Sequence, residues 1–272
     1  MRDGAPCEDC IGKSRWPGIF HRCYRGSALG SACVGLIGPR LKKLIRRYPR
    51  SITLIALTNF AKSRYVADEF STENIIVRGN CLADPGIGLP TRDKRIVYVG
   101  RLSPEKGVET LLHAAKTLDG ELEIIGDGPD RQRLEAINDG KAKFLGALHP
   151  AQVFARIKTA TALAVPSRSY EGFPMVVLEA MATGTPVIAS KIGSLAEIVR
   201  DGETGILVDP LNVEAWNKGL SFLLSDSEVA QRFGSSARQL YLRNYCEEKG
   251  TRSLAQIYQE AKNKLLVNTE KI

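Results

Sequence analysis

The chain has 272 residues, of which 43% are hydrophobic and 25% charged, a composition typical of a soluble globular protein and not of a disordered one. Its net charge of +8 resides in residues 1–50, which hold 11 Lys and Arg against 3 Asp and Glu. The other residues hold 27 of each sign, so the main body is electrically balanced. No nucleic-acid-binding motif accompanies the basic segment, so nucleic acid is not expected as a partner.

Residues 1–39 show no helical or strand periodicity, and their Gly, Pro and Cys content predicts loops. Cys7 and Cys10 form a C-x-x-C pair, and Cys23 follows with His21 close by. These four side chains are an alternative zinc site if the loop folds back, because a structural zinc takes four ligands. Otherwise they are reduced thiols and a surface histidine, and no metal is expected.

The expected location is the cytoplasm. The small, apolar-leaning run Ser27–Pro39 is too short and too interrupted by glycine to cross a bilayer. Asp3, Glu8 and Asp9 precede any apolar core, which argues against a signal peptide.

The segment Arg40–Arg50 is predicted to be an amphipathic basic helix. Leu41, Leu44, Ile45 and Tyr48 recur at helical spacing, with cations on the other faces. A solvated helix packed on the fold is one interpretation. A helix at the surface of an anionic membrane, peripheral at the inner face, is the other.

Two short strands and a helix follow, and then a linker. Apolar residues predict a strand over Ser51–Leu57, and Thr58 or Asn59 caps a helix that reaches about Phe70. A second strand covers Ile75–Val77. Residues 82–94 are rich in Pro and Gly and are predicted to be a linker.

From Arg95 onward the pattern alternates between strands and helices, which predicts an α/β fold with a doubly wound parallel sheet. Helices are expected to begin at Pro129, Pro150 and Pro174, and three more helices end the chain. The expected strands are Ile96–Val99, Leu122–Ile125, Lys143–Leu145, Thr161–Val165, Pro186–Ala189 and Ile206–Val208.

The stretch Ser169–Gly184 holds the clearest chemical signal. A polar loop with Glu171 leads into an apolar helix that runs from Pro174 to a C-cap at Gly184. Glu179 is the only charge in that helix, and a buried carboxylate is costly unless something donates hydrogen bonds to it. Because a helix N-terminus binds anions, a ligand with a phosphate there and hydroxyls further along suits both features.

Glu171 and Glu179, with seven residues between them, resemble the paired-glutamate motif of the retaining glycosyltransferases of family 4, which have the GT-B fold. Three further segments match the family in order and spacing. They are Val99–Gly107, Ile125–Pro129 and Gly193–Val199. Together the matches cover about residues 95–208.

The resemblance implies a domain organisation. Residues 1–81 correspond to a remnant of the N-terminal acceptor domain, with the Cys-rich basic segment inside it, and 82–94 to the linker. Residues 95–248 correspond to the Rossmann-like nucleotide-sugar domain, and 249–272 to a helix that crosses back, with a tail. The family's first N-terminal strands have no counterpart here, so the chain resembles a truncated member.

The resemblance also implies the roles of the site residues. Arg101 and Lys106 bind and stabilise the leaving diphosphate, Glu171 contacts the donor sugar and Glu179 the ribose. Arg101, Lys106 and Glu171 are therefore the catalytic candidates. The nucleotide-sugar-binding candidates are Gly126, Gly128, Gly146, Gly172, Phe173, Pro174, Met175, Glu179 and Gly193. No Asp-x-Asp motif is present, so we expect metal independence and no cofactor beyond the donor substrate.

The expected function is transfer of a sugar from a nucleotide-diphosphate sugar, with retention of configuration, to a carbohydrate or lipid-linked acceptor, as in the synthesis of cell-envelope polysaccharide. The alternative is a truncated, non-catalytic nucleotide-sugar-binding subunit that needs a partner chain. The unpaired edge of the 51–77 sheet favours association with a partner chain or another copy. A dinucleotide-dependent dehydrogenase is excluded because no G-x-G-x-x-G follows any strand.

Overall fold

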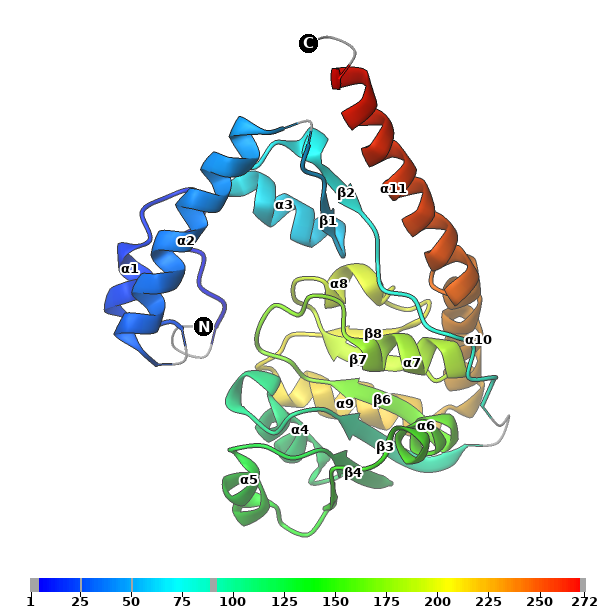
Figure 1. Cartoon of the computed structure of the whole chain (residues 1–272). Coiled ribbons are helices and arrows are strands. Elements are labelled where there is room, and N and C mark those ends of the chain that lie inside the picture. The colour runs from blue at the N-terminus through cyan, green and yellow to red at the C-terminus, as the bar shows by residue number, and fades with distance from the viewer. Residues whose placement is uncertain (1–4, 25, 50, 89–91, 270–272) are drawn as a thin grey trace. The chain divides into compact units, whose positions relative to one another are not determined.

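A computed structural model describes residues 5–24, 26–49, 51–88 and 92–269, with side chains described as far as residue 264. The chain divides into two units, Asn80–Gly250 and Met1–Gly79 together with Thr251–Ile272 (Figure 1). In the described ranges, no helix combines the length and the hydropathy that a membrane span requires.

The larger unit is built on a six-stranded parallel sheet in the order β5-β4-β3-β6-β7-β8. Its strands are β3 (Asp93–Val99), β4 (Glu121–Ile125), β5 (Ala142–Gly146), β6 (Ala160–Val165), β7 (Val187–Ser190) and β8 (Gly205–Val208). Each predicted strand is present within three residues at its ends. The doubly wound α/β fold predicted from the alternation of strands and helices is confirmed.

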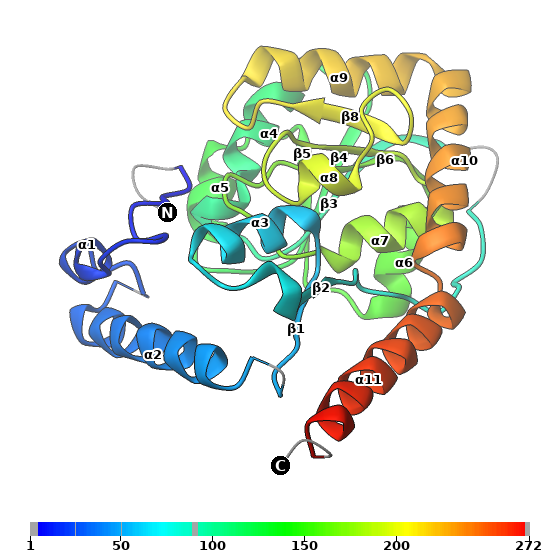
Figure 2. The same cartoon turned by 90° about the horizontal axis from the view of Figure 1, so that it is seen from above.

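Helices cover both faces of this sheet. The helices are α4 (Val108–Ala115), α5 (Arg131–Ile137), α6 (Pro150–Thr159), α7 (Met175–Thr183), α8 (Leu195–Ile198), α9 (Val213–Ser225) and α10 (Ser227–Asn244), with a 3₁₀ turn at Pro104–Lys106. Helices α4 and α9 lie on one face, and α6 and α7 lie on the other (Figures 1 and 2).

Alternating side chains of the strands supply the two halves of the core. Ile96 and Tyr98 of β3 join Leu111 of α4 and Trp216 of α9 in one buried cluster. Val97, between them in sequence, points to the opposite face and is also fully buried. Burial of a large apolar side chain contributes about 1.5–3 kcal/mol, so this two-sided core holds the sheet rigid.

The strand order places a topological switch point between β3 and β6. The chain leaves β3 toward β4 on one side, and β6 leads to β7 on the other. In such sheets the loops that follow the two central strands separate and leave a crevice at their carboxyl ends. The loops after β3 and β6 contain Lys106 and Glu171, respectively.

The smaller unit contains a two-stranded parallel sheet. Its elements are α1 (Trp16–Phe20), α2 (Ala28–Arg47), β1 (Leu54–Ala56), α3 (Asn59–Ala67), a 3₁₀ turn at Thr72–Asn74 and β2 (Ile75–Val77). Strand β1 is shorter than predicted. The Thr58 hydroxyl accepts from the Ala61 N–H at 3.0 Å and caps α3, as predicted.

The prediction of loops over residues 1–39 is wrong for residues 16–20 and 28–39, which belong to α1 and α2, while residues 6–15 and 21–24 form no helix or strand. Helix α2 begins at Ala28, where the Ser27 hydroxyl caps it, and it continues through Pro39 into the predicted basic helix. The glycines that suggested a loop instead permit close packing, because a Cβ at Gly38 would lie 2.8 Å from the Arg15 guanidinium carbon. Arg50, the last residue of the predicted helix, lies outside the described residues.

Between the two sheets, residues 82–88 and 92 have no regular secondary structure. Strand β3 begins at Asp93, so the last two residues of the predicted linker belong to the sheet, and residues 89–91 lie outside the described part. Arg92 donates to the carbonyls of Gly184 and Ala160 at 2.6 and 2.9 Å, which fixes this end of the linker to the larger unit. Helix α11 (Glu247–Thr269) ends the chain, and its residues from Thr251 group with the smaller unit.

Candidate nucleotide-sugar site

A cavity of about 390 Å³ lies at the carboxyl ends of the central strands. The end of β3, the start of α6 and the start of α7 line it. Its lining residues are Val99, Gly100, Lys106, Leu148, Pro150, Val153, Phe154, Glu171, Pro174, Met175, Val176 and Glu179. The walls are largely apolar, and three charged side chains interrupt them, a composition common in small-molecule sites.

Lys106 and Glu171, predicted from separate motifs, form an ion pair on this cavity. The Lys106 Nζ lies 2.7 Å from the Glu171 Oε1, and the side chain of each residue is mostly shielded from solvent. The buried Ser167 hydroxyl donates to the same carboxylate oxygen at 2.6 Å. Glu171 is therefore held by two donors, which fixes its orientation toward the cavity.

The ion pair forms because two loops touch at Gly107. This residue has a φ of +69°, and a Cβ there would lie 2.0 Å from the Pro166 carbonyl oxygen. The Arg168 N–H also donates to the Glu105 carbonyl at 2.8 Å, which ties the loop after β6 to the loop after β3. Only glycine permits both this backbone conformation and this approach.

Glu179 lies one turn into α7, half-buried on the cavity wall. Burial raises the pKa of its carboxyl group. Across the described residues, no group donates a hydrogen bond to this carboxylate. Helix α7 begins one residue later than predicted, with Pro174 as N-cap, and its first residues Met175 and Val176 line the same cavity. First-turn N–H groups have no acceptor within a helix, so this wall offers hydrogen-bond donors to an anion.

Glycines stand side by side at the ends of three adjacent strands. The Gly100 N–H donates to the Ile125 carbonyl at 3.0 Å, and the Gly126 N–H donates to the Gly146 carbonyl at 2.8 Å. A Cβ at Gly126 or Gly128 would lie about 2 Å from the carbonyl oxygens of Gly100 and Leu102, respectively. These glycines therefore permit close packing between strand-end loops, a role beyond the predicted approach to a ligand, and only Gly100 lines the cavity.

The structure does not bring every predicted residue to the cavity. Arg101 is exposed and is not among the lining residues, although its carbonyl accepts from the Tyr98 hydroxyl at 2.9 Å. Gly172 is exposed on the loop, and Gly193 has a φ of +53° before the short α8; neither lines the cavity. Phe173 is buried against Tyr245, with ring centroids 5.3 Å apart, so its side chain packs the core.

The zinc alternative is not supported. Among the described residues, which include Cys7, Cys10, His21 and Cys23, no group of three or more His, Cys, Asp or Glu side chains is placed to hold a metal ion. Cys7, His21 and Cys23 are exposed. The segment between the C-x-x-C pair and Cys23 contains α1.

Several lining residues were not predicted. Val153 and Phe154 of α6 line the cavity beside Leu148, whose loop was expected near the base, and Ser167, behind the lining, orients Glu171. Phe154 and Val153 have the spacing of an ordinary amphipathic helix, so no local signal separates them from core residues. Ser167 follows a completely buried strand and precedes Glu171, a position that topology alone marks as functional.

The larger unit matches a known family. A sequence profile described as glycosyl transferases group 1 matches residues 83–240. This range covers more than half of the chain and includes every residue that lines the cavity.

The curated relatives of the chain include a glycosyltransferase and a glycogen synthase. D-inositol 3-phosphate glycosyltransferase of Corynebacterium efficiens is 35% identical over 191 residues, which cover 64% of this chain and 45% of the relative. Glycogen synthase of Mycobacterium tuberculosis is 33% identical over 184 residues, covering 63% and 44%. The match thus spans less than half the length of these relatives.

Solved structures share the fold. The Anabaena protein HepE, in complex with UDP and glucose, superposes with a TM-score of 0.72 at 19% identity and covers 81% of this chain and 66% of that one. The lipopolysaccharide outer core galactosyltransferase WaaB, in its apo form, gives a TM-score of 0.65 at 27% identity, covering 76% and 62%. Both similarities cover a larger share of this chain than the family profile does.

Proposed function

Because the chain belongs to the glycosyl transferases group 1 family, we propose that it binds a nucleotide-diphosphate sugar at the cavity and transfers the sugar to an acceptor. The proposal includes family 4, retention of configuration and metal independence. The observation that carries it is the convergence of Lys106, Glu171 and Glu179 on one cavity at the N-terminus of α7. The acceptor is a carbohydrate or a lipid-linked sugar.

The chemistry explains the need for these groups. Transfer breaks the bond between the anomeric carbon and the phosphate oxygen, and negative charge develops on the departing diphosphate. The Lys106 ammonium and the first-turn N–H groups of α7 can stabilise that charge, so a metal ion is not required. Glu171 accepts hydrogen bonds from the donor sugar, and Glu179 accepts them from the ribose hydroxyls, as family resemblance implies. Arg101 reaches the diphosphate only after its exposed side chain turns inward.

Donor binding is expected to replace the ion pair between Lys106 and Glu171 with one between Lys106 and the diphosphate. In the free protein Glu171 neutralises Lys106, and a bound diphosphate competes for the same ammonium. Glu171 is then free to accept from sugar hydroxyls. Binding of nucleotide and binding of sugar are therefore expected to support each other, because each supplies a new partner to one half of the pair.

Calorimetric titration with UDP and UDP-glucose tests this proposal, since similar folds have been solved with these ligands. We expect binding that survives EDTA and weakens by about 1.5–3 kcal/mol in Lys106→Ala, the usual contribution of a hydrogen bond to a charged group. Lys116→Ala, which removes an exposed lysine at the end of α4, should bind normally.

Three results would contradict the proposal. Failure to bind any nucleotide-diphosphate sugar would refute the donor site. If EDTA treatment abolishes binding or transfer and added magnesium restores it, metal independence is refuted. A product with inverted anomeric configuration, detected by proton NMR of the transferred sugar, would refute retention. Donor binding without transfer to any acceptor supports the non-catalytic alternative instead.

A further inference from the structure

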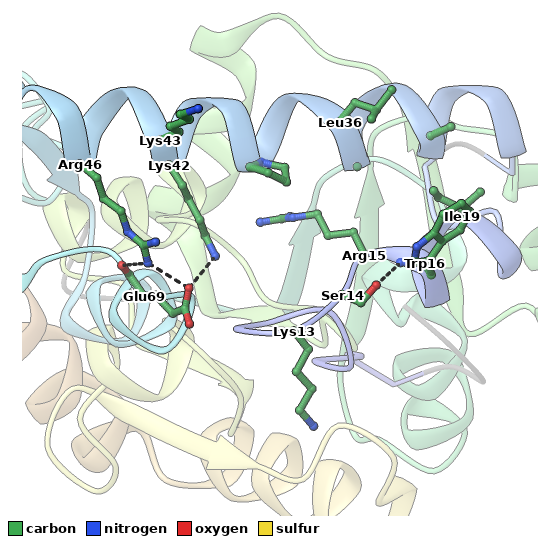
Figure 3. Close-up of a pocket in the computed structure, with 13 residues that line it drawn as sticks. Lys13, Ser14, Arg15, Trp16, Ile19, Leu36, Lys42, Lys43, Arg46 and Glu69 are labelled. Carbon is green, nitrogen blue, oxygen red and sulfur yellow. Dashed lines mark hydrogen bonds and ion pairs between the residues drawn. The ribbon is translucent and has the colours of Figure 1, made fainter.

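The smaller unit holds a cavity of about 780 Å³, larger than the donor cavity. It lies between α1 and α2, and its lining includes residues 13–16, 42, 43, 46 and 69 (Figure 3). Lys42 and Arg46 extend from α2 toward Glu69. The Lys42 Nζ lies 3.9 Å and the Arg46 Nη2 3.0 Å from the Glu69 Oε2. We use "α1–α2 hairpin" for residues 13–47.

The α1–α2 hairpin is strongly cationic. No Asp or Glu occurs between Asp9 and Asp68, a stretch that contains 12 Lys and Arg. Asp68 and Glu69 neutralise part of this charge; the Lys42 Nζ lies 2.8 Å from the Asp68 Oδ1. For Lys13 and Lys43, which also line the cavity, the described residues provide no acidic partner.

The α1–α2 hairpin also exposes large apolar side chains. Trp16 is 64% exposed, Phe20 is 78% exposed and Leu36 is 61% exposed. The rings of Trp16 and Phe20 lie 6.3 Å apart, and Trp16 and Leu36 both line the cavity beside the unpaired lysines. Exposed aromatic, leucine and lysine side chains around one cavity have the composition of helices that lie in a membrane interface.

We propose that the α1–α2 hairpin is a docking surface for an anionic phospholipid membrane. Lys13 and Lys43 contact lipid phosphates, and Trp16, Phe20 and Leu36 enter the adjacent apolar layer. The prediction for Arg40–Arg50 is thereby refined: the contact begins with α1 and includes the first half of α2, which sequence patterns assigned to loops. The proposal does not depend on the donor cavity.

Charge and exposure favour this occupant over others. A second copy of the chain would bring two cationic hairpins together, which like-charge repulsion opposes. A free anion such as inorganic phosphate would neutralise the lysines and leave the Trp16 and Phe20 rings in water. Nucleic acid would attract the lysines equally but does not require the exposed Leu36.

Vesicle binding by the full chain is the test. The two probes are vesicles of phosphatidylcholine alone and of phosphatidylcholine mixed equally with phosphatidylglycerol. We expect sedimentation with the mixed vesicles only, weakened by added salt. Tryptophan emission should shift to shorter wavelength on binding, and the shift will report Trp16, because Trp216 is completely buried.

Matched variants separate specific docking from general stickiness. Lys13→Gln and Lys43→Gln should each lower vesicle binding about fivefold, the usual effect of one basic residue near an anionic surface. Lys116→Gln and Lys249→Gln remove exposed lysines of the larger unit and should have no such effect. Leu36→Ser should lower binding about tenfold, while Leu211→Ser, at 60% exposure on the larger unit, should not.

Each contrary result overturns the proposal. Equal binding to both vesicle types, or no binding to either, would show that an anionic membrane is not the partner. Equal losses of vesicle binding in the hairpin variants and their controls would show that the hairpin is not the docking surface. Displacement of the protein by millimolar inorganic phosphate at constant ionic strength indicates a free-anion site, and tighter binding to an oligonucleotide than to vesicles indicates nucleic acid. Retained UDP binding in the hairpin variants keeps this outcome distinct from failure of the donor site.

Discussion

Glu179 shows how one residue can be unfavourable for the free protein and required for a ligand. Its carboxylate is half-buried in α7, and none of the described groups donates to it. Burial without donors raises its pKa, because the ionised form loses hydration. A ligand hydroxyl that donates to this carboxylate would remove that cost.

Replacement of Glu179 by Gln should therefore stabilise the free protein at neutral pH. Folding favours the protonated carboxyl, since its pKa is higher in the folded state than in the unfolded state. Its contribution to stability is present below the unfolded-state pKa and is lost as the pH rises through the folded-state pKa. Thermal melts should show a gain for Glu179→Gln that is larger near pH 7 than near pH 4.

The same variant should bind UDP-glucose about 1–3 kcal/mol more weakly, because an amide accepts weaker hydrogen bonds than a carboxylate. Glu260→Gln, an exposed helical glutamate of α11, serves as the control for both measurements. Unchanged affinity would show that Glu179 does not contact the donor. If the melting temperatures of Glu179→Gln and the wild type differ by the same amount at both pH values, ionisation of the buried carboxyl does not destabilise the protein.

At the scale of elements, the site depends on contacts between loops and helices that hold no ligand themselves. Gly107 lets the loops after β3 and β6 touch, and a buried ionic cluster holds α6 to the sheet. In that cluster Glu123 of β4 pairs with Arg156 of α6 at 2.7 Å and with Arg95 of β3 at 3.5 Å. Neither Gly107 nor this ionic cluster is among the residues that line the cavity.

Gly107→Ala should lower the free energy of unfolding much more than Gly202→Ala does. Gly202 has nearly the same φ, +72°, but a Cβ there would meet nothing within 4 Å. Gly202→Ala should cost about 1–2 kcal/mol of unfolding free energy from backbone strain alone. Gly107→Ala should cost at least about 3 kcal/mol and weaken UDP-glucose binding, because the loops must separate. Equal costs in denaturant titrations would refute the loop contact.

Glu123→Ala should destabilise the larger unit by about 1.5–3 kcal/mol, since it removes the buried carboxylate that pairs with Arg156 and Arg95, while Arg95 keeps Asp93 as a partner. Glu121 is two residues away on the same strand, but it is exposed and pairs with Lys143 on the surface. Glu121→Ala should have little effect in the same urea titration. A small loss for Glu123→Ala would mean that water or rearrangement replaces the missing charge.

At the scale of the whole molecule, the two units differ in how much core they contain. The larger unit has a continuous cluster on one face of the sheet and a second layer on the other. In the described residues of the smaller unit up to Gly79, the buried apolar side chains are Ile45, Ala56 and Ile75. The smaller unit should therefore unfold first on heating.

Donor binding should distinguish the two units. Every residue that lines the donor cavity belongs to Asn80–Gly250, so a ligand should stabilise this unit only. At a UDP concentration about 100 times Kd, the gain should be about 2.7 kcal/mol. Calorimetric scans should show the later transition move upward and the earlier one stay in place. A single transition that moves as a whole would show that the units unfold together.

Sequence patterns predicted the larger unit better than the smaller one for a physical reason. Buried parallel strands such as Ala160–Val165 are continuous apolar runs, and the alternation with helices leaves few possible folds. In α2, glycines and a proline occur inside a helix, and the Arg15 side chain packs close to Gly38, a tertiary contact with no local signal. The placement of Lys106 and Glu171 at the same end of the sheet followed from the parallel strands, but their ion pair and the exposure of Arg101 did not.

The crowded position of Gly100 has a consequence for how such a site can diversify. A Cβ there would lie 2.8 Å from the Tyr98 hydroxyl, so this wall of the cavity is bare backbone and offers a mutation nothing to change. Another part of the lining consists of Leu148, Val153 and Phe154, which are free to vary in size and polarity. Inherited or engineered shifts in donor preference should therefore accumulate at the start of α6, while the glycine wall stays the same across descendants.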